Sequence, residues 1–344
     1  MNGTKDSVLE VKKLSISIKL DEGLLTPVRG VDFQLYRNET LGLVGESGCG
    51  KSLLCKAVIG INDKKFKSEG SVHLVDENGK AKELLGLQFG GKEIRSIRGK
   101  SISMIFQEPM SSFSPLFTVG HQISENVRLH VTRDKQEARR MTIKMMQKVG
   151  IANAEQRYKQ YPHEFSGGML QRSLIAMALI CQPHILIADE PTTALDVTIQ
   201  AQILQMLKNL QKDVGMSIIY ITHDLGTVAQ ICDRVAVMYL GKIIEIATVD
   251  EIFKNPLHPY TEGLIHSVHK IGGKTERLFS IEGFVPLAMN LDNRCGFYDR
   301  CTRRNKECLT LPEPHLVQTS EGHSVACYKY TNNSKPELLE KEVG

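Results

Sequence analysis

The chain has 344 residues, 41% hydrophobic and 24% charged, which is typical of an ordinary globular protein with one large domain or two smaller ones. Its 43 basic and 39 acidic residues leave a formal charge of +4 without a basic stripe, which argues against a nucleic-acid partner. It has no apolar run of the roughly 18 to 20 residues that a membrane span needs and no secretory signal, so we expect a cytosolic protein that serves a membrane process only through a separate membrane partner.

The predicted elements alternate between strands and helices along most of the chain. Alternating apolar residues predict strands within residues 8–18 and 31–35. A short apolar strand over Thr40–Val44 is followed by glycines and then by a helix from Lys51 to Gly60. Further apolar runs predict buried strands at 102–106, 185–188, 218–221 and 235–239. Strands separated by helical stretches predict an α/β fold with a largely parallel sheet.

Two regions depart from this alternation. The pattern is helical between residues 117 and 180, notably over 135–148 and 169–180, which predicts a helical subdomain (about 110–180) inserted into the α/β core. After about residue 263 the alternation stops and four cysteines gather. We expect one large domain over 1–265, a cysteine-containing extension over 266–330 and a polar, disordered tail over 331–344.

A phosphate-binding motif follows the strand that ends at Val44. Residues 45–52 read GESGCGKS, which matches the G-x-x-x-x-G-K-[ST] loop whose backbone amides cradle phosphate oxygens at a helix N-terminus. Lys51 can reach the β- and γ-phosphates, and Ser52 can bind Mg²⁺. The residues that we expect to hold ATP here are Gly45, Ser47, Gly48, Cys49, Gly50, Lys51, Ser52 and Leu53.

Two adjacent acids end the segment ILIADE over residues 185–190. A buried strand delivers Asp189 to the carboxyl edge of the sheet, where ligands bind in open α/β sheets, and Asp189 should hold Mg²⁺ directly or through water. Glu190 is then placed to polarise an attacking water. A P-loop kinase would not need this second carboxylate, because its nucleophile arrives on the substrate. The pair therefore favours ATP hydrolysis.

A second anion site is indicated by the segment FSGGMLQR at 165–172, which resembles the signature sequence of ABC ATPases. The hydroxyl of Ser166, the amides of Gly167 and Gly168 and the following helix N-terminus suit a γ-phosphate. Since one phosphate chain is already held by the loop at 45–52, we infer that this site serves ATP bound to a partner subunit.

Three further residues match ABC motifs in the expected order. Gln107 matches the Q-loop glutamine, which in the family senses Mg²⁺ and faces the membrane partner. Asp196, in Ala194-Leu195-Asp196, matches the D-loop. His223 matches the switch histidine, which contacts the γ-phosphate. The resemblance thus implies a catalytic pair of Glu190 and His223, with Mg²⁺ held by Ser52, Gln107 and Asp189.

The resemblance narrows to a subfamily. The segments FQEPMSSFSPLFTVG, HEFSGGMLQR, ADEPTTALDVTIQAQIL and NPLHPYTEGL closely resemble ATPase subunits of bacterial oligopeptide and dipeptide importers, a group that includes nickel and glutathione importers. The match covers roughly residues 8–330. It implies an ABC-type P-loop ATPase domain with an N-terminal antiparallel β part, an inserted helical subdomain and a cysteine-rich C-terminal extension.

The same resemblance implies the function and partners. We expect an ATPase subunit that powers peptide import from the cytoplasmic face of the bacterial membrane. Its partners would be a second homologous ABC ATPase subunit, two membrane-spanning permease subunits and, indirectly, an extracellular substrate-binding protein. The alternatives are a nickel, metallophore or glutathione importer, a soluble non-transport ABC ATPase, a P-loop kinase and a redox protein.

Two positions depart from the family pattern. ABC ATPases commonly stack an aromatic residue on adenine about two dozen residues before the phosphate loop, but residues 21–25 contain none. We expect adenine to pack on Leu24 or Leu25 or to be held loosely. Leu170 stands where the subfamily usually has arginine.

The clustered cysteines are Cys295, Cys301, Cys308 and Cys327. Their spacing, C-x5-C-x6-C-x18-C, is neither that of common zinc fingers nor that of common ferredoxins. Four thiolates can hold Zn²⁺ or an iron–sulfur cluster. The resemblance implies a [4Fe-4S] cluster, while zinc, unmetallated thiols and disulfides remain open; His315 and His323 would be spare ligands for zinc. The other cysteines, apart from Cys49 in the phosphate loop, are expected to be small core residues: Cys55, Cys181 and Cys232.

Overall fold

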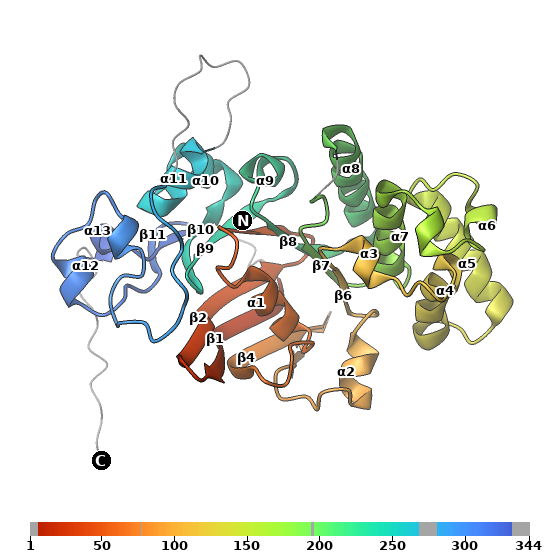
Figure 1. The fold of residues 1–344 in the computed structure, drawn as a ribbon, viewed down its shortest axis with the longest axis horizontal. Coiled ribbons are helices and arrows are strands. Elements are labelled where there is room, and N and C mark those ends of the chain that lie inside the picture. The colour runs from red at the N-terminus through yellow and green to blue at the C-terminus, as the bar shows by residue number, and fades with distance from the viewer. Residues whose placement is uncertain (1–5, 77, 194–195, 268–280, 332–344) are drawn as a thin grey trace.

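Two β-sheets form the centre of the protein in the computed structural model, which describes residues 6–76, 78–193, 196–267 and 281–331 (Figure 1). The smaller sheet has four antiparallel strands in the order β2-β1-β4-β5. Its strands are β1 (Ser7–Leu20), β2 (Gly23–Tyr36), β4 (Lys67–Val75) and β5 (Ala81–Glu83). The strands predicted within residues 8–18 and at 31–35 lie in β1 and β2.

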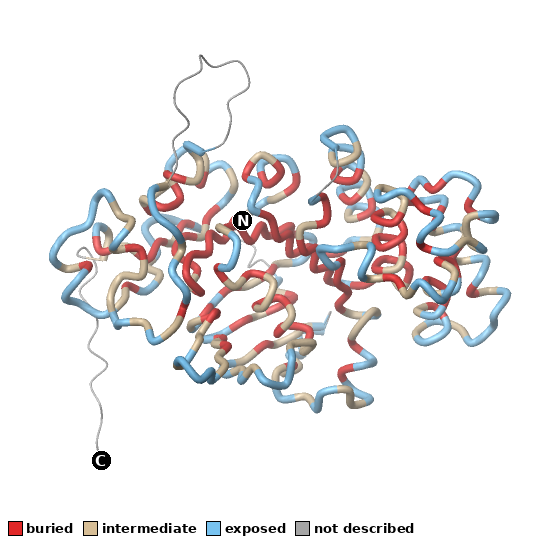
Figure 2. The backbone as a smooth tube through the Cα atoms, viewed as in Figure 1, coloured by how far each residue is buried: buried red, intermediate tan, exposed pale blue. Residues whose placement is uncertain are grey.

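The larger sheet has eight strands in the order β11-β12-β10-β9-β3-β8-β7-β6. Its five parallel strands are β3 (Thr40–Val44), β6 (Ile102–Ile105), β7 (Ile185–Asp189), β8 (Ser217–Thr222) and β9 (Arg234–Tyr239). β3, β6, β7 and β8 are buried along their whole length, as their continuous apolar sequences require, and Figure 2 shows them within a buried central band. All five predicted short strands are thus present.

Antiparallel strands complete one edge of this sheet. They are β10 (Lys242–Thr248), β11 (Val317–Ser320) and β12 (His323–Val325). The sequence assigned no strand to the C-terminal extension, yet β11 and β12 continue the larger sheet beyond β10. Short strands of this kind carry little periodic signal of their own.

Helices occupy the chain between β6 and β7 and gather at one end of the molecule (Figure 1). They are α3 (Pro109–Ser112), α4 (Val119–His130), α5 (Lys135–Lys148), α6 (Ala154–Arg157), the 3-10 helix η1 (Pro162–Glu164) and α7 (Gly167–Leu179). The bounds of α5 agree with the predicted helix at 135–148. Its first turn is capped by Asp134, whose side chain accepts hydrogen bonds from Gln136 N and Glu137 N. Apolar residues of α4, α5 and α7, including Ile123, Met146 and Leu174, share one core.

The remaining helices flank the sheets or belong to the extension. They are α1 (Lys51–Val58), α2 (Lys92–Ile97), α8 (Val197–Val214), α9 (Leu225–Ile231), α10 (Val249–Lys254), α11 (Pro259–His266), η2 (Tyr298–Arg300), α12 (Glu307–Thr310) and α13 (Tyr328–Thr331). Among the described helices, none is both long and apolar enough to cross a bilayer.

The C-terminal extension is joined to the ATPase core through a buried carboxylate. Glu245 of β10 is fully buried and accepts hydrogen bonds from Leu257 N at 2.8 Å and His258 N at 2.9 Å. Nε2 of His323, on β12, lies 2.8 Å from the same carboxylate. The predicted disordered tail at 331–344 lies, except for Thr331, outside the described residues.

Candidate nucleotide site

The loop between β3 and α1 depends on glycines. Gly50 caps α1 with φ of +103°, and Gly45 has φ of +155°, a backbone region that other residues rarely adopt. A Cβ atom at Gly45 would lie 2.1 Å from the carbonyl oxygen of Met238, and one at Gly50 would lie 2.1 Å from that of Pro27. The loop therefore packs closely against the backbones of β2 and β9, and only glycine fits at these two positions.

Polar side chains of α1 and β7 meet at the carboxyl edge of the sheet. Nζ of Lys51 donates to the carbonyl oxygens of Gly45 at 2.7 Å and Glu46 at 2.9 Å. Oγ of Ser52 donates to Oδ1 of Asp189 at 3.0 Å. Burial raises the pKa of Asp189, and the hydrogen bond from Ser52 opposes that effect.

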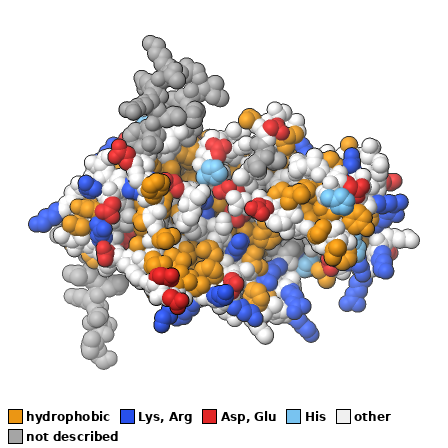
Figure 3. All heavy atoms as spheres, viewed as in Figure 1, with side chains coloured by type: hydrophobic (Ala, Val, Ile, Leu, Met, Phe, Trp, Pro, Cys, Tyr) orange, Lys and Arg blue, Asp and Glu red, His pale blue; other side chains and the backbone are white. Residues whose placement is uncertain are grey.

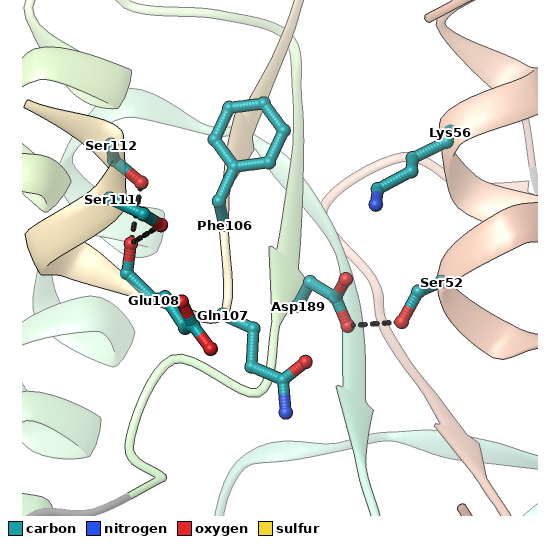
Figure 4. Close-up of a pocket in the computed structure, with 8 residues that line it drawn as sticks. All are labelled: Ser52, Lys56, Phe106, Gln107, Glu108, Ser111, Ser112 and Asp189. Atoms are coloured by element: carbon teal, nitrogen blue, oxygen red, sulfur yellow. Dashed lines mark hydrogen bonds between the residues drawn. The ribbon is translucent and has the colours of Figure 1, made fainter. Parts of the chain in front are cut away.

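A cavity of about 420 Å³ opens beside this pair. Figure 4 shows Ser52 and Asp189 facing Gln107 and Phe106 across it, with Lys56 above Ser52. A hydroxyl, a carboxylate and an amide oxygen are the hard oxygen ligands that Mg²⁺ prefers. The chemistry of these side chains therefore fits a magnesium ion.

Glu190 lies at the centre of a group of polar side chains. The group contains the predicted residues Gln107 and His223 and one residue that was not predicted, Thr193. The carboxylate of Glu190 accepts from Thr193 Oγ1 at 2.9 Å and from Gln107 Nε2 at 3.2 Å, and it lies 3.1 Å from Nδ1 of His223. Its backbone has φ of +46°, and its N–H donates to the carbonyl of Ile221 at 3.0 Å. A left-handed non-glycine backbone is costly and marks a position fixed by its surroundings.

The pKa of the Glu190 carboxyl group is set by opposing effects. Partial burial alone would raise its pKa, but the hydrogen bonds from His223 and Thr193 and the nearby charge of Lys51 outweigh burial and lower it. Glu190 is consequently ionised at neutral pH. An ionised carboxylate that is held in place can orient a water molecule and accept its proton.

The signature segment, residues 165–172, lies away from the phosphate loop of the same chain (Figure 1). Ser166 caps α7 by accepting a hydrogen bond from Met169 N at 3.4 Å, and Ser166 and Gly167 are exposed. In Figure 1, α7 lies apart from α1, so the chain does not bring these residues to its own phosphate loop. Gly168 faces Ile199, since a Cβ atom there would lie 3.5 Å from its Cγ2. Leu170 is fully buried and packs as a core residue.

Asp196 has a structural contact that its motif did not predict. Its side chain caps α8 by accepting a hydrogen bond from Ile199 N at 2.9 Å. The other two residues of the predicted D-loop, 194 and 195, lie outside the described residues.

The segment expected to pack on adenine is covered in part by the C-terminal extension. Leu24 is 51% exposed, and its N–H donates to Oδ1 of Asn290 at 3.0 Å. Leu25 pairs with Met289 in an antiparallel bridge. The sequence did not predict this contact between two segments more than 260 residues apart.

The sequence did not predict two polar contacts of Glu46, a residue of the phosphate loop. Its partners are Tyr260 and Arg300. Glu46 N–H donates to Tyr260 Oη at 2.9 Å, and its carboxylate pairs with Arg300. Glu46 was within the motif but at one of its unspecified positions. Tyr260 lies in the family segment NPLHPYTEGL, but that resemblance did not indicate a contact with the phosphate loop, and no local pattern marks Arg300.

The four clustered cysteines lie near one another. Cys308 is buried and the other three are half-buried. Burial first, and then the neighbouring thiols, raise the pKa of Cys295 to about 12 and also raise those of Cys301 and Cys327. All eight cysteines are free thiols. In the part of the chain that the structure describes, no three His, Cys, Asp or Glu side chains are arranged as a metal-binding group.

His323, one of the two expected spare zinc ligands, is 2% exposed, and its Nε2 lies 2.8 Å from the carboxylate of Glu245. The spare-ligand role of His315 and His323 stays a prediction. Cys55 is fully buried, as expected of a small core residue, whereas Cys181 and Cys232 are only partly buried.

The fold, the phosphate loop and the paired acids on one sheet edge define a P-loop nucleotide hydrolase. Residues 28–193 match the family model described as ABC transporter. Residues 244–308 match the model described as the C-terminal region of oligopeptide/dipeptide transporters.

Curated relatives match along almost the whole chain. The dipeptide transport ATP-binding protein DppD of Bacillus subtilis is 46% identical, over 97% of this chain and 98% of the relative. The oligopeptide transport ATP-binding protein AppD of the same organism is 45% identical, over 94% and 97%. OppD of Haemophilus influenzae is 44% identical, over 93% and 97%.

Solved structures share the fold of the ATPase part. The ATP-binding cassette MJ0796, in a dimer bound to ADP and Pi, superposes with a TM-score of 0.62 at 24% identity, over 70% of this chain and 98% of that chain. The protein cbiO1 of Clostridium perfringens, part of the ABC transporter complex cbiONQ, gives 0.60 at 28% identity, over 73% and 92%. The chain therefore belongs to the ABC transporter family, among the ATP-binding proteins of peptide transporters, and its activity is ATP hydrolysis.

Proposed function

We propose that this chain hydrolyses Mg-ATP at the cytoplasmic face of the membrane to power the import of peptides. The observation that carries the proposal is the grouping of Glu190 with Gln107, Thr193 and His223 beside the Ser52–Asp189 pair. The family model of the C-terminal region and the names of the relatives favour peptides over nickel, metallophores or glutathione as the cargo.

Each step of hydrolysis falls to a residue of this group. The loop amides of residues 45–50 and Lys51 bind the phosphates. Leu53, on α1, is a further residue of the ATP site. Ser52, Asp189 and Gln107 would hold Mg²⁺, which would neutralise charge on the phosphate oxygens. Glu190 orients the attacking water and accepts its proton, while His223 reaches from the end of β8 to the γ-phosphate.

The active form is a pair of ATPase subunits. Ser166 and Gly167 are exposed and Gly168 is half-buried at the N-terminus of α7, and a helix N-terminus on the surface suits the γ-phosphate bound by another subunit. Asp196, which caps α8, is the D-loop contribution to the same interface. The partner is a second, homologous ABC ATPase.

Membrane-spanning permease subunits dock on the helical part of the chain. Met110, Leu116 and Phe117 around α3 are 63%, 78% and 51% exposed, and Figure 3 shows hydrophobic side chains gathered at this end of the molecule. Clustered exposed apolar residues indicate a protein partner. We propose that residues 110–180 act as a helical subdomain of the ATPase domain, 1–265, and that an extracellular binding protein delivers the peptide to the permeases.

The cysteines of the extension, 266–330, are proposed to hold a [4Fe-4S] cluster, with Zn²⁺ as the weaker option. The support is the resemblance of the four-cysteine segment to the family extension, the hydrogen bond from Cys295 N to the carbonyl of Cys308 at 3.2 Å, and the softness of thiolate ligands. Binding a metal centre would contribute folding free energy to a segment that has only short helices and strands.

The experiment that tests the ATPase site compares Glu190→Gln with Lys51→Ala. Glutamine keeps the size of Glu190 but is no base, and its amide nitrogen cannot accept a hydrogen bond, so steady-state hydrolysis should fall by about 10²- to 10⁴-fold with ATP affinity preserved. Lys51→Ala should instead lose affinity. Equal loss of ATP binding in the two variants would show that the roles are wrongly assigned.

A further inference from the structure

An ion pair joins the phosphate loop to the cysteine-containing extension. Nη1 of Arg300 lies 2.7 Å from Oε2 of Glu46, and its Nη2 lies 3.0 Å from Oε1. The side chain of Arg300 is 5% exposed and that of Glu46 is 32% exposed. Arg300 ends η2, directly before Cys301. The contact is a bidentate pair, the strongest geometry for an arginine and a carboxylate.

Glu46 connects this arginine to the lysine of the phosphate loop. Its carbonyl oxygen accepts from Nζ of Lys51 at 2.9 Å, and its N–H donates to Oη of Tyr260 at 2.9 Å. The carboxylate of Glu46 therefore belongs to the loop that receives the phosphates. Without a cation beside it, this negative charge would repel a polyanionic ligand.

Arg300 is itself held in place from the extension. Its Nε donates to the carbonyl of Glu282 at 3.0 Å, and Nη2 also lies 3.3 Å from the carbonyl of Ile281. Its guanidinium lies 5.8 Å from the ring centre of Tyr239, which packs edge-on against Phe297 of the extension. The guanidinium is thus fixed before any ligand arrives.

We propose that Arg300 is a positioning residue for nucleotide binding: it neutralises the Glu46 carboxylate and holds it away from the phosphates. ATP affinity therefore depends on the C-terminal extension, although the phosphate loop is near the other end of the chain. The inference rests on the proposed role of Lys51 and its loop in binding ATP.

The chain offers a matched control in the pair Arg29–Glu313. Nη1 and Nη2 of Arg29 donate to the two carboxylate oxygens of Glu313 at 2.7 and 2.9 Å. This pair also joins the core to the extension and is also largely buried. The third hydrogen bond of Arg29 goes to the carbonyl of Leu240, so this arginine does not neutralise the loop carboxylate.

The test measures binding of the fluorescent analogue TNP-ATP, with Mg²⁺, to the full-length chain. Arg300→Met should weaken binding on the order of tenfold, because it leaves the Glu46 charge unpaired. Arg29→Met should lower the melting temperature of the chain, although Glu313 keeps its ion pair with Lys242, yet change affinity by less than about twofold. The double variant E46Q/R300M removes both charges and should restore affinity to within about threefold of the unmodified chain.

Two results would overturn the inference even if Arg300→Met weakens binding. One is an equal loss of TNP-ATP affinity in Arg300→Met and Arg29→Met, which would assign the effect to general stability. The other is a failure of E46Q/R300M to recover affinity. If the unmodified chain binds no TNP-ATP, the proposed function falls as well, whereas normal binding with an unaffected Arg300→Met variant removes only the role of Arg300.

Discussion

Acid should destabilise the junction between core and extension through His258. This side chain is 3% exposed, and its Nδ1 accepts a hydrogen bond from Tyr260 N at 3.0 Å, capping α11. Burial lowers its pKa from 6.5 to about 3, so the folded protein keeps the ring neutral while the unfolded chain protonates it. Between these two pKa values the unfolded state binds the extra proton, and stability falls as the pH falls.

The magnitude follows from the two pKa values. Each pH unit below 6.5 costs about 1.4 kcal/mol of unfolding free energy, so the loss between pH 7 and pH 5 is about 2 kcal/mol from this residue alone. The assay is urea unfolding of the full-length chain at both pH values, compared with His258→Asn. Asparagine can cap the helix but does not titrate.

The variant should lose about 2 kcal/mol less stability than the unmodified chain on acidification. Equal losses in the two proteins would refute the assignment of His258 as a buried neutral cap.

Three further predictions follow from the same structure. The isolated chain should hydrolyse ATP slowly and with a rate per subunit that rises with protein concentration, because Ser166 lies apart from its own phosphate loop; fast, concentration-independent turnover would contradict this. Glu245→Ala should lower stability by about 3 to 5 kcal/mol in denaturant melts, since two backbone N–H groups and His323 lose their buried acceptor; a change below about 1 kcal/mol would show that the carboxylate is dispensable. Anaerobically purified protein should contain about four irons per chain, and zinc without iron in elemental analysis would exclude the cluster.

The predictable part of the fold is the part with local signals. The predicted strands at 40–44, 185–188 and 218–221 are short, mainly apolar runs, so their burial on both faces could be read from the sequence, and α5 had a regular helical period. By contrast, β11 and β12 are four and three residues long. They become strands because β10 offers them an edge, and that pairing is set by tertiary structure.

The residues of the candidate site also fall into two groups: those marked by a local motif and those brought together only by the fold. Lys51, Ser52, Asp189 and Glu190 lie in short motifs whose spacing follows from a strand, a turn and a helix. The pairing of Glu46 with Arg300 spans 254 positions. Glutamate and arginine at these positions look like ordinary surface residues until the extension folds back on the loop.

The central claim is that ATP hydrolysis at this site powers peptide import. The direct measurement is uptake of a labelled peptide into proteoliposomes that contain this chain, its partner ATPase, two permease subunits and the binding protein, with ATP supplied on the side of the ATPase subunits. We expect ATP-dependent uptake with the unmodified chain and no uptake above background with Glu190→Gln. Equal uptake with the two chains, or none with either while ATP is hydrolysed, would contradict it.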